Sequence, residues 1–155
     1  MLAIRGALGE TVGADLLIEA ALRALLEGVD SPSLVLLAGL GRSEESEAQD
    51  LFRATVSELD LAPSLPAERR ALRWELVRWW CQLILAGQLR PEVGGRLIWM
   101  HGWDELDYPA SLQQVVGLVS EWEDWSPDWS VDREDYGRGI VDEAAALLAG
   151  PWPPE

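Results

Sequence analysis

The sequence predicts an all-α fold: a single compact domain of six or seven helices around a central, tryptophan-rich helix at about residues 67–86. Apolar residues recur at helical spacing along most of the chain, and no segment alternates convincingly with the period of two that is typical of strands. The length of 155 residues suits one domain. We therefore expect a helical domain at residues 1–150 and a short, extended, proline-rich tail at residues 151–155.

Three helices are expected before a loop with two prolines at residues 61–66, namely residues 14–27, about 31–40 and about 43–60. Gly28 follows the first helix at the position where glycine commonly ends one. Asp30 or Ser31 is expected to cap the second helix, and Ser43 or Ser46 the third, because short polar side chains accept hydrogen bonds from first-turn amides. The first part of the chain is thus predicted to be three short helices.

The helix predicted at about residues 67–86 is apolar on most sides, which is typical of a helix buried against several neighbours. One face carries Leu72, Leu76, Trp79, Trp80, Leu83 and Ile84, and a second carries Trp74, Val77, Cys81 and Leu85. We expect Cys81 to be a packed, inert thiol. Gly87 is predicted to end this helix.

Three more helices complete the predicted fold: from Pro91 to about residue 99, from Pro109 to a break or kink at Pro127, and over about 131–149. The segment that starts at Asp132 has the outline of an EF-hand calcium loop, with acids at loop positions 1, 3 and 12 and a glycine at position 6. Tyr136 stands at position 5, which needs a ligand. A continuous helix explains this segment better, so we predict no metal site.

Acidic residues strongly outnumber basic ones, giving a net charge of −15 with twelve arginines and no lysine. Residues 104–135 hold ten acidic residues and only one basic residue, Arg133. Such a field repels phosphate backbones and anionic lipid, and it attracts a basic protein surface. We therefore expect a basic protein partner and no nucleic-acid or membrane binding. No secretory signal or membrane-spanning stretch is visible, so a cytoplasmic location is expected.

No sequence pattern typical of an enzyme is visible. One histidine, His101, and one cysteine cannot supply the three or four ligands of the familiar zinc sites. Phosphate-binding, dinucleotide-binding and nucleophile-elbow motifs are missing as well. His101 lies at a corner between helices and is interpreted as a partly buried, hydrogen-bonded residue. We predict no catalytic residue, metal or cofactor.

Tryptophans at helix ends and in connectors, with the acids beside them, form the predicted partner-binding surface. Indole rings are amphipathic and over-represented in binding hot spots. The surface comprises Trp103, Asp104, Glu105, Asp107, Trp122, Glu123, Asp124, Trp125, Asp128 and Trp129. Trp125 lies off the apolar stripe of its helix, and Trp129 has no evident core role. The alternative interpretation is that these rings wedge helix ends together.

Glu123 projects near the middle of the apolar face of the helix predicted at 109–125. Unless that helix ends earlier, the carboxylate needs an arginine partner, because an unpaired buried charge is costly. We expect Arg73, Arg78 or Arg96 to pair with it and to tie this helix to the central one.

Residues 76–99, "LVRWWCQLILAGQLRPEVGGRLIW", contain a tryptophan-bearing helix, an apolar–Gly–x–x–x–Pro corner and a helix that ends in Ile-Trp. This pattern resembles one in small uncharacterised helical proteins, largely actinobacterial, some of them of immunity-protein type. The resemblance covers only this stretch and identifies no catalytic residue. It implies a cytosolic inhibitor of a bacterial toxin.

The leading hypothesis is therefore a non-enzymatic, acidic protein-binding module, most concretely an immunity or antitoxin-like inhibitor of a basic bacterial toxin. The first alternative is a housekeeping or scaffold helical protein that acts as a homodimer through its tryptophan-rich surface. The second is a carboxylate- or metal-dependent enzyme, which only the acidic clusters support. The lack of catalytic motifs and the uneven charge favour the first hypothesis.

Overall fold

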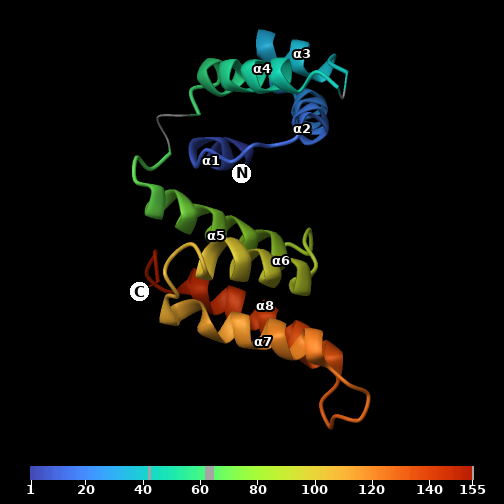
Figure 1. Ribbon diagram of the computed structural model, residues 1–155, viewed down its shortest axis with the longest axis vertical. Coiled ribbons are helices and arrows are strands. Elements are labelled where there is room, and N and C mark those ends of the chain that lie inside the picture. Colours follow the sequence, from blue (N-terminus) through green and yellow to red (C-terminus); the bar gives the residue numbers. More distant parts are fainter. Residues whose placement is uncertain (42, 62–64, 155) are drawn as a thin grey trace. The chain divides into compact units, whose positions relative to one another are not determined.

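The computed structural model describes residues 1–41, 43–61 and 65–154, and all regular secondary structure in these residues is helical (Figure 1). The α-helices are α1 (Leu2–Ala7), α2 (Ala14–Leu26), α3 (Pro32–Ala38), α4 (Glu45–Glu58), α5 (Arg69–Leu85), α6 (Pro91–Ile98), α7 (Gln113–Asp124) and α8 (Arg133–Ala149). A π-helical turn, Trp99–Trp103, continues α6, and a 3-10 turn, Ala110–Leu112, leads into α7. The predicted all-α class is confirmed. The helix that the sequence did not predict is α1.

The helices form two compact units, residues 1–67 and 68–155, which are described separately. In unit 1, helices α2, α3 and α4 pack around a core that includes Leu17, Leu34 and Leu37. Helix α1 has no buried residue, although Leu2 packs against the edge of this core. The expectation of one domain over residues 1–150 stays a prediction.

The predicted helix starts in unit 1 are partly confirmed. Ser31 caps α3, and its hydroxyl accepts a hydrogen bond from the amide of Leu34 at 3.3 Å. The predicted cap of α4 is wrong, because the N-cap is Glu44 and its side chain bonds back to the amide of Gly41 at 2.6 Å. The acidic residues in the first turn stabilise the start of α4 without a serine cap, because their negative charge interacts favourably with the positive end of the helix dipole. The loop predicted at 61–66 falls partly on residues 62–64, which lie outside the described residues.

Glu58, at the end of α4, binds the start of α3. Its carboxylate accepts hydrogen bonds from the hydroxyls of Ser31 and Ser33, at 2.5 Å each, and from the amide of Ser33 at 3.0 Å. The Ser31 hydroxyl has the largest effect, and together these donors lower the pKa of Glu58. The ionised carboxylate therefore links α3 to α4.

Unit 2 depends on glycines where α6 and the π-helical turn meet their neighbours. A Cβ atom added at Gly94 would lie 2.6 Å from side-chain carbons of Ile84 in α5, and one added at Gly95 would overlap the Cγ2 methyl of Val119 in α7. A Cβ at Gly102 would lie 2.7 Å from a methyl of Val77 in α5. Only a residue without a side chain allows these backbones to approach so closely.

Helix α5 is largely buried, as its apolar pattern predicts. Cys81 is inaccessible, so the expected packing of its thiol is confirmed, and burial raises the pKa of the thiol to about 12. A thiol of high pKa that solvent does not reach fits the prediction that it is inert. Two details differ from the predicted faces. Leu85, at the end of the helix, is 43% exposed, whereas Arg73 is 4% exposed. Helix α5 packs against α6, α8 and the π-helical turn within unit 2.

The C-terminal tail packs onto α5 and the 3-10 turn that leads into α7, although the sequence predicts only a short extended segment. The ring of Trp152 meets that of Trp74 edge to face, with centroids 5.8 Å apart. The guanidinium of Arg78 lies 5.6 Å from the Trp152 centroid, and the Ser111 hydroxyl donates to the carbonyl of Pro154 at 3.2 Å. Aromatic contacts of this kind stabilise beyond simple burial, so the tail is held on the surface of unit 2 with the Trp152 ring partly buried.

Replacing Gly95 with alanine is expected to lower the free energy of unfolding of unit 2 by about 1–3 kcal/mol, because overpacking outweighs the gain in helix propensity of about 1 kcal/mol. Denaturant unfolding followed by tryptophan fluorescence measures the change. Gly117→Ala is the matched control, since a Cβ there meets nothing within 4 Å, and it should be neutral or stabilising. Equal effects at both positions would contradict the close approach at α6.

The Glu58 interaction predicts a pH-dependent stability of unit 1. The folded-state pKa is below the unfolded value, so the carboxylate's contribution is present above the unfolded value of about 4.3. It is lost as pH falls through the lower, folded-state pKa. We expect Glu58→Gln to unfold at a lower temperature than the wild type at neutral pH, and the difference to shrink on acidification. A difference that is independent of pH would show that the carboxylate charge has no role.

Candidate functional site

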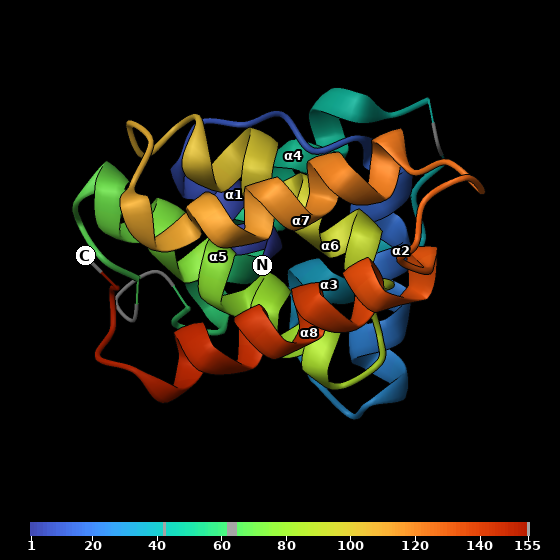
Figure 2. The same ribbon diagram turned by 90° about the horizontal axis from the view of Figure 1, so that it is seen from below.

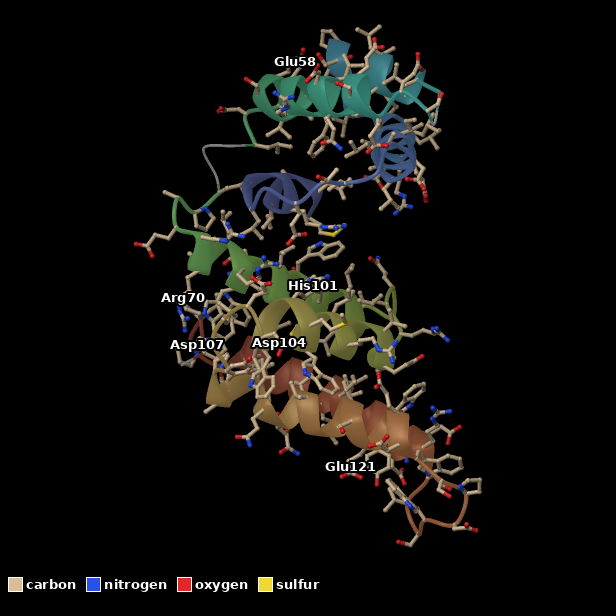
Figure 3. All side chains as sticks on the ribbon, viewed as in Figure 1. Glu58, Arg70, His101, Asp104, Asp107 and Glu121 are labelled. Carbon is tan, nitrogen blue, oxygen red and sulfur yellow. The ribbon has the colours of Figure 1, made fainter. Side chains whose placement is uncertain are left out.

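The structure separates the ten predicted binding residues into two groups at opposite ends of α7 (Figure 2). The connector group, Trp103, Asp104, Glu105 and Asp107, precedes the helix. The remaining six lie at its C-terminal end, in a region that we call the tip and define as residues 121–136. A helix of 12 residues is about 18 Å long, so the two groups do not share one contact patch. Figure 3 shows Asp104 and Asp107 together and Glu121 apart from them.

The segment that carries the connector group is attached to α5 by two arginines of that helix. Glu105 lies 3.7 Å from the buried guanidinium of Arg73, and Arg70 donates to the carbonyl of Leu106 at 2.8 Å. The ring of Trp103 meets Tyr108 edge to face at 4.8 Å, and its indole N–H is buried without an acceptor in the part of the chain that the structure describes. Asp104 and Asp107 remain exposed. This group therefore offers carboxylates but no exposed tryptophan ring.

Trp125 closes the loop between α7 and α8. Helix α7 ends at Asp124, before Pro127, and Trp125 is its C-cap residue with an extended backbone. The half-buried indole donates a hydrogen bond to the carbonyl of Val131 at 2.8 Å, across the loop. Trp125 thus has a structural role, and the interpretation that such rings hold helix ends together applies to it.

Trp122 is held by an arginine from the next helix. The guanidinium carbon of Arg133 lies 3.7 Å from the centre of the Trp122 ring, and Nε of the same side chain donates to the Trp122 carbonyl at 3.1 Å. A cation over an indole face at this distance is a favourable interaction. Arg133 therefore joins the end of α7 to the start of α8 and covers one face of the ring.

Trp129 differs from the other two tip tryptophans because it is exposed, with 40% of the residue surface accessible. It meets Tyr136 of α8 edge to face, with centroids 6.3 Å apart and planes at 72°. The neighbouring Val131 is also exposed, at 39%. Trp129 is therefore a large ring that is oriented by a neighbour and still accessible to a partner.

Glu123 pairs with Arg96, one of its three predicted partners. Nε of Arg96 donates to the carboxylate at 2.7 Å. Arg96 belongs to α6, so the pair ties α7 to α6 and not to the central helix α5. The Glu123 side chain is 31% exposed, which makes this a surface ion pair of modest energy.

Charge at the tip is strongly one-sided. It contains seven acidic side chains and one arginine. Asp132 and Asp135 form a capping box at the start of α8, and Asp135 also pairs with Arg138. In the described parts of the chain, no ion pair involves Glu121, Asp124, Asp128 or Glu134. These four carboxylates are the charges that the tip can offer to an external cation.

The tip does not have the arrangement of a metal centre. Asp132 takes part in the capping box of α8, and the segment that follows is continuous helix, as predicted in preference to an EF-hand loop. Within residues 1–41, 43–61 and 65–154, no three or more His, Cys, Asp or Glu side chains are grouped as metal ligands would be. His101 is half-buried with its ring 6.2 Å from Trp80, and the expected hydrogen bond to it is not seen among these residues.

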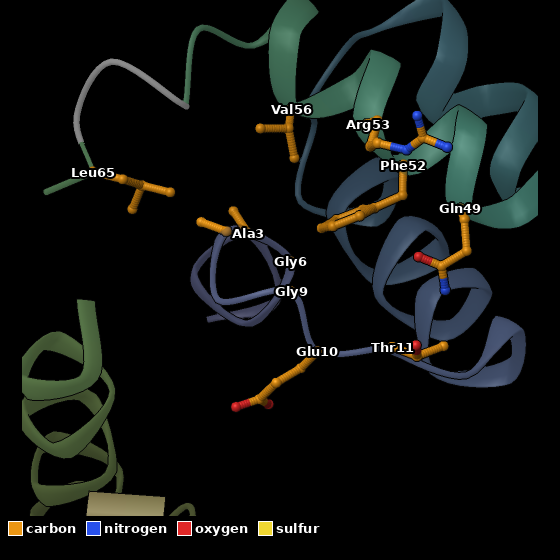
Figure 4. Close-up of a pocket in the computed structure, with 11 residues that line it drawn as sticks. Ala3, Gly6, Gly9, Glu10, Thr11, Gln49, Phe52, Arg53, Val56 and Leu65 are labelled. Atoms are coloured by element: carbon orange, nitrogen blue, oxygen red, sulfur yellow. The ribbon is translucent and has the colours of Figure 1, made fainter. Parts of the chain in front are cut away.

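A pocket of about 530 Å³ in unit 1 lies between α1 and α4 (Figure 4). Its walls are formed mainly by small or apolar residues, including Ala3, Phe52 and Val56. Figure 4 shows the charged ends of Glu10 and Arg53 pointing away from the space. Ligand sites need a few convergent polar groups to orient what they bind, so this pocket is a weaker candidate than the tip.

Comparison of the chain with protein-family models, with curated proteins and with solved structures gives no match. The candidate site therefore rests on the residues themselves. None of the helices in the described residues combines the length and the apolar character that a bilayer crossing requires.

Two arginines at these sites were not predicted from the sequence as structural contacts: Arg70, which holds the connector, and Arg133, which covers Trp122. Arg73 was one of the three predicted partners of Glu123, and it lies instead near Glu105 of the connector. Arg73 is five residues from Arg78 on the same helix, yet it is buried and Arg78 is exposed. Helical spacing places them on different faces of α5, with Arg73 on the side of Leu76 and Trp80, but it does not identify the distant partner of either side chain. The only local signal is the single arginine among the acids of the tip, Arg133.

Replacing Trp125 with phenylalanine keeps an aromatic ring but removes the donor to Val131. We expect this to destabilise the loop by about 1 kcal/mol, the usual net value of such a hydrogen bond. Hydrogen exchange of the backbone amides of residues 128–131 should become faster, while the amides in the middle of α5 stay protected. Unchanged exchange in the loop would show that Trp125 does not close it.

Proposed function

We propose that the protein is a non-enzymatic, acidic protein-binding module whose tip docks onto a basic surface of a protein partner. The observation that carries the proposal is Trp129, a residue that is 40% exposed and whose ring is oriented by Tyr136. The preceding residue, Asp128, has no ion pair in the described residues. A rigid exposed indole supplies affinity, and the carboxylates around it supply steering and choice of partner.

In its most specific form, the module is an immunity or antitoxin-like inhibitor of a basic bacterial toxin. The resemblance of residues 76–99 to helical proteins of immunity-protein type supports this form, and so does the net charge of −15. The proposal includes a cytoplasmic location and a single domain organised around α5.

The same surface is less suited to a homodimer. A two-fold interface would place each tip, or part of it, against an identical patch, and like charges that face each other are unfavourable. The unpaired Asp124, Asp128 and Glu134 would oppose that contact. A basic partner meets no such repulsion.

The test uses the full chain as an immobilised bait in native cell lysate at low and high salt. Trp129→Ala and Asp128→Asn are expected to weaken capture of a basic partner, the tryptophan change by about tenfold or more if the ring is a hot spot. Capture by the wild type should decrease at high salt, because salt screens the attraction between exposed charges. Light scattering of the bait alone, at several concentrations, measures self-association.

The matched control is Asp142→Asn, which removes an exposed carboxylate of α8 outside the tip. It should leave capture unchanged, and all variants should keep the thermal unfolding of the wild type. If Trp129→Ala and Asp128→Asn bind as the wild type does, the tip is not the docking surface. A concentration-dependent dimer that is lost in Trp129→Ala would favour the scaffold alternative.

A further inference from the structure

Unit 2 has a groove of about 380 Å³ where the ends of three helices meet, and Trp122 of the tip is one of its lining residues. Pro91 and Glu92 come from the start of α6, Trp122 from the end of α7, and Glu134, Gly137 and Val141 from α8. We propose that this groove receives one arginine side chain of the basic partner. This inference rests on the proposed function and names a specific contact within it.

The shape of the groove suits a long side chain because one of its lining residues is a glycine. A Cβ atom added at Gly137 would meet no atom within 4 Å, so the space above this helical position is open. Pro91, Trp122 and Val141 give the groove apolar walls. The aliphatic stem of an arginine can lie against such walls while its charged end reaches a carboxylate.

One carboxylate of the groove takes part in no ion pair in the described residues and can bind the charged end of the incoming arginine. Glu92 is paired with Arg90 at 3.3 Å, and Arg138, which also lines the groove, is paired with Asp135. Glu134 lines the groove, is exposed and takes part in no ion pair in the described part of the chain. An incoming cation therefore meets a carboxylate whose charge is not already neutralised.

Arginine fits this place better than lysine. A guanidinium is planar and less strongly hydrated than an ammonium, so it loses less when it lies against tryptophan and proline, and it can bind a carboxylate through two N–H groups. Trp122 already carries Arg133 on one face, which shows that this ring accepts a guanidinium. The apolar walls and the carboxylate of Glu134 therefore suit an arginine side chain better than a lysine side chain.

The direct test titrates the full chain with N-acetyl-arginine amide at millimolar concentration and follows the indole N–H signals of its nine tryptophans by NMR. The signal of Trp122, assigned by its loss in Trp122→Phe, should shift and saturate. N-acetyl-lysine amide, which has the same charge, should shift it clearly less at equal concentration. A linear drift shared by all the tryptophans, or an equal effect of the lysine probe, would overturn the proposal.

Two pairs of variants separate the groove from general acidity. Gly137→Leu should fill the groove and abolish the saturable shift, whereas Gly117→Leu, where an added Cβ also meets nothing within 4 Å, should leave it unchanged. Glu134→Gln should weaken the binding of the arginine probe by about fivefold, and Asp142→Asn should not weaken it. Both leucine variants are expected to fold, because neither position is packed.

The two proposals fail in different ways. If partner capture depends on Trp129 but not on Gly137→Leu, and Trp122 does not respond to the arginine probe, the groove proposal is wrong and the proposed function stands. If the probe binds at Trp122 while Trp129→Ala and Asp128→Asn leave capture unchanged, the groove accepts arginine and the docking surface is not the one proposed.

Discussion

The close approach of α6 to its neighbours is the constraint on which unit 2 depends. Gly94 faces Ile84 of α5 and Gly95 faces Val119 of α7, with Ile140 of α8 also in contact range. Adjacent positions on α6 point to different helices. Two consecutive glycines therefore allow α6 to approach α5 and α7 closely at the same time. A larger side chain at either position would separate these helices, and the cavities left behind would cost stability.

That packing also positions the tip. The end of α7 and the start of α8 are joined to each other by Arg133 on Trp122, and α7 is joined to α6 by Glu123 and Arg96. Trp125 closes the loop between them through the carbonyl of Val131. Each contact alone is worth little, but together they hold the loop in one arrangement. A surface that is ordered before binding loses less conformational entropy when a partner docks.

Local patterns predicted most of the fold and little of the site. Helical spacing identified seven of the helices, and Ser31, Pro91 and Gly28 mark boundaries where capping chemistry requires those residues. Helix α1 has only six residues and no buried face, so it has no amphipathic pattern to detect. The predicted binding surface joined residues that are close in sequence, but a helix between them places them far apart.

The structure divides the acidic residues of the tip into two sets. The first set stabilises the fold by pairing with arginine or capping a helix, and it comprises Glu123, Asp132 and Asp135. The second set has no ion pair in the described residues, and it comprises Glu121, Asp124, Asp128 and Glu134. The net charge acts at long range and accelerates encounter with any basic protein. Choice among basic proteins requires short-range contacts, which affect dissociation more than association. In the function that we propose, the second set of carboxylates, with Trp129 and the groove beside Trp122, provides these short-range contacts.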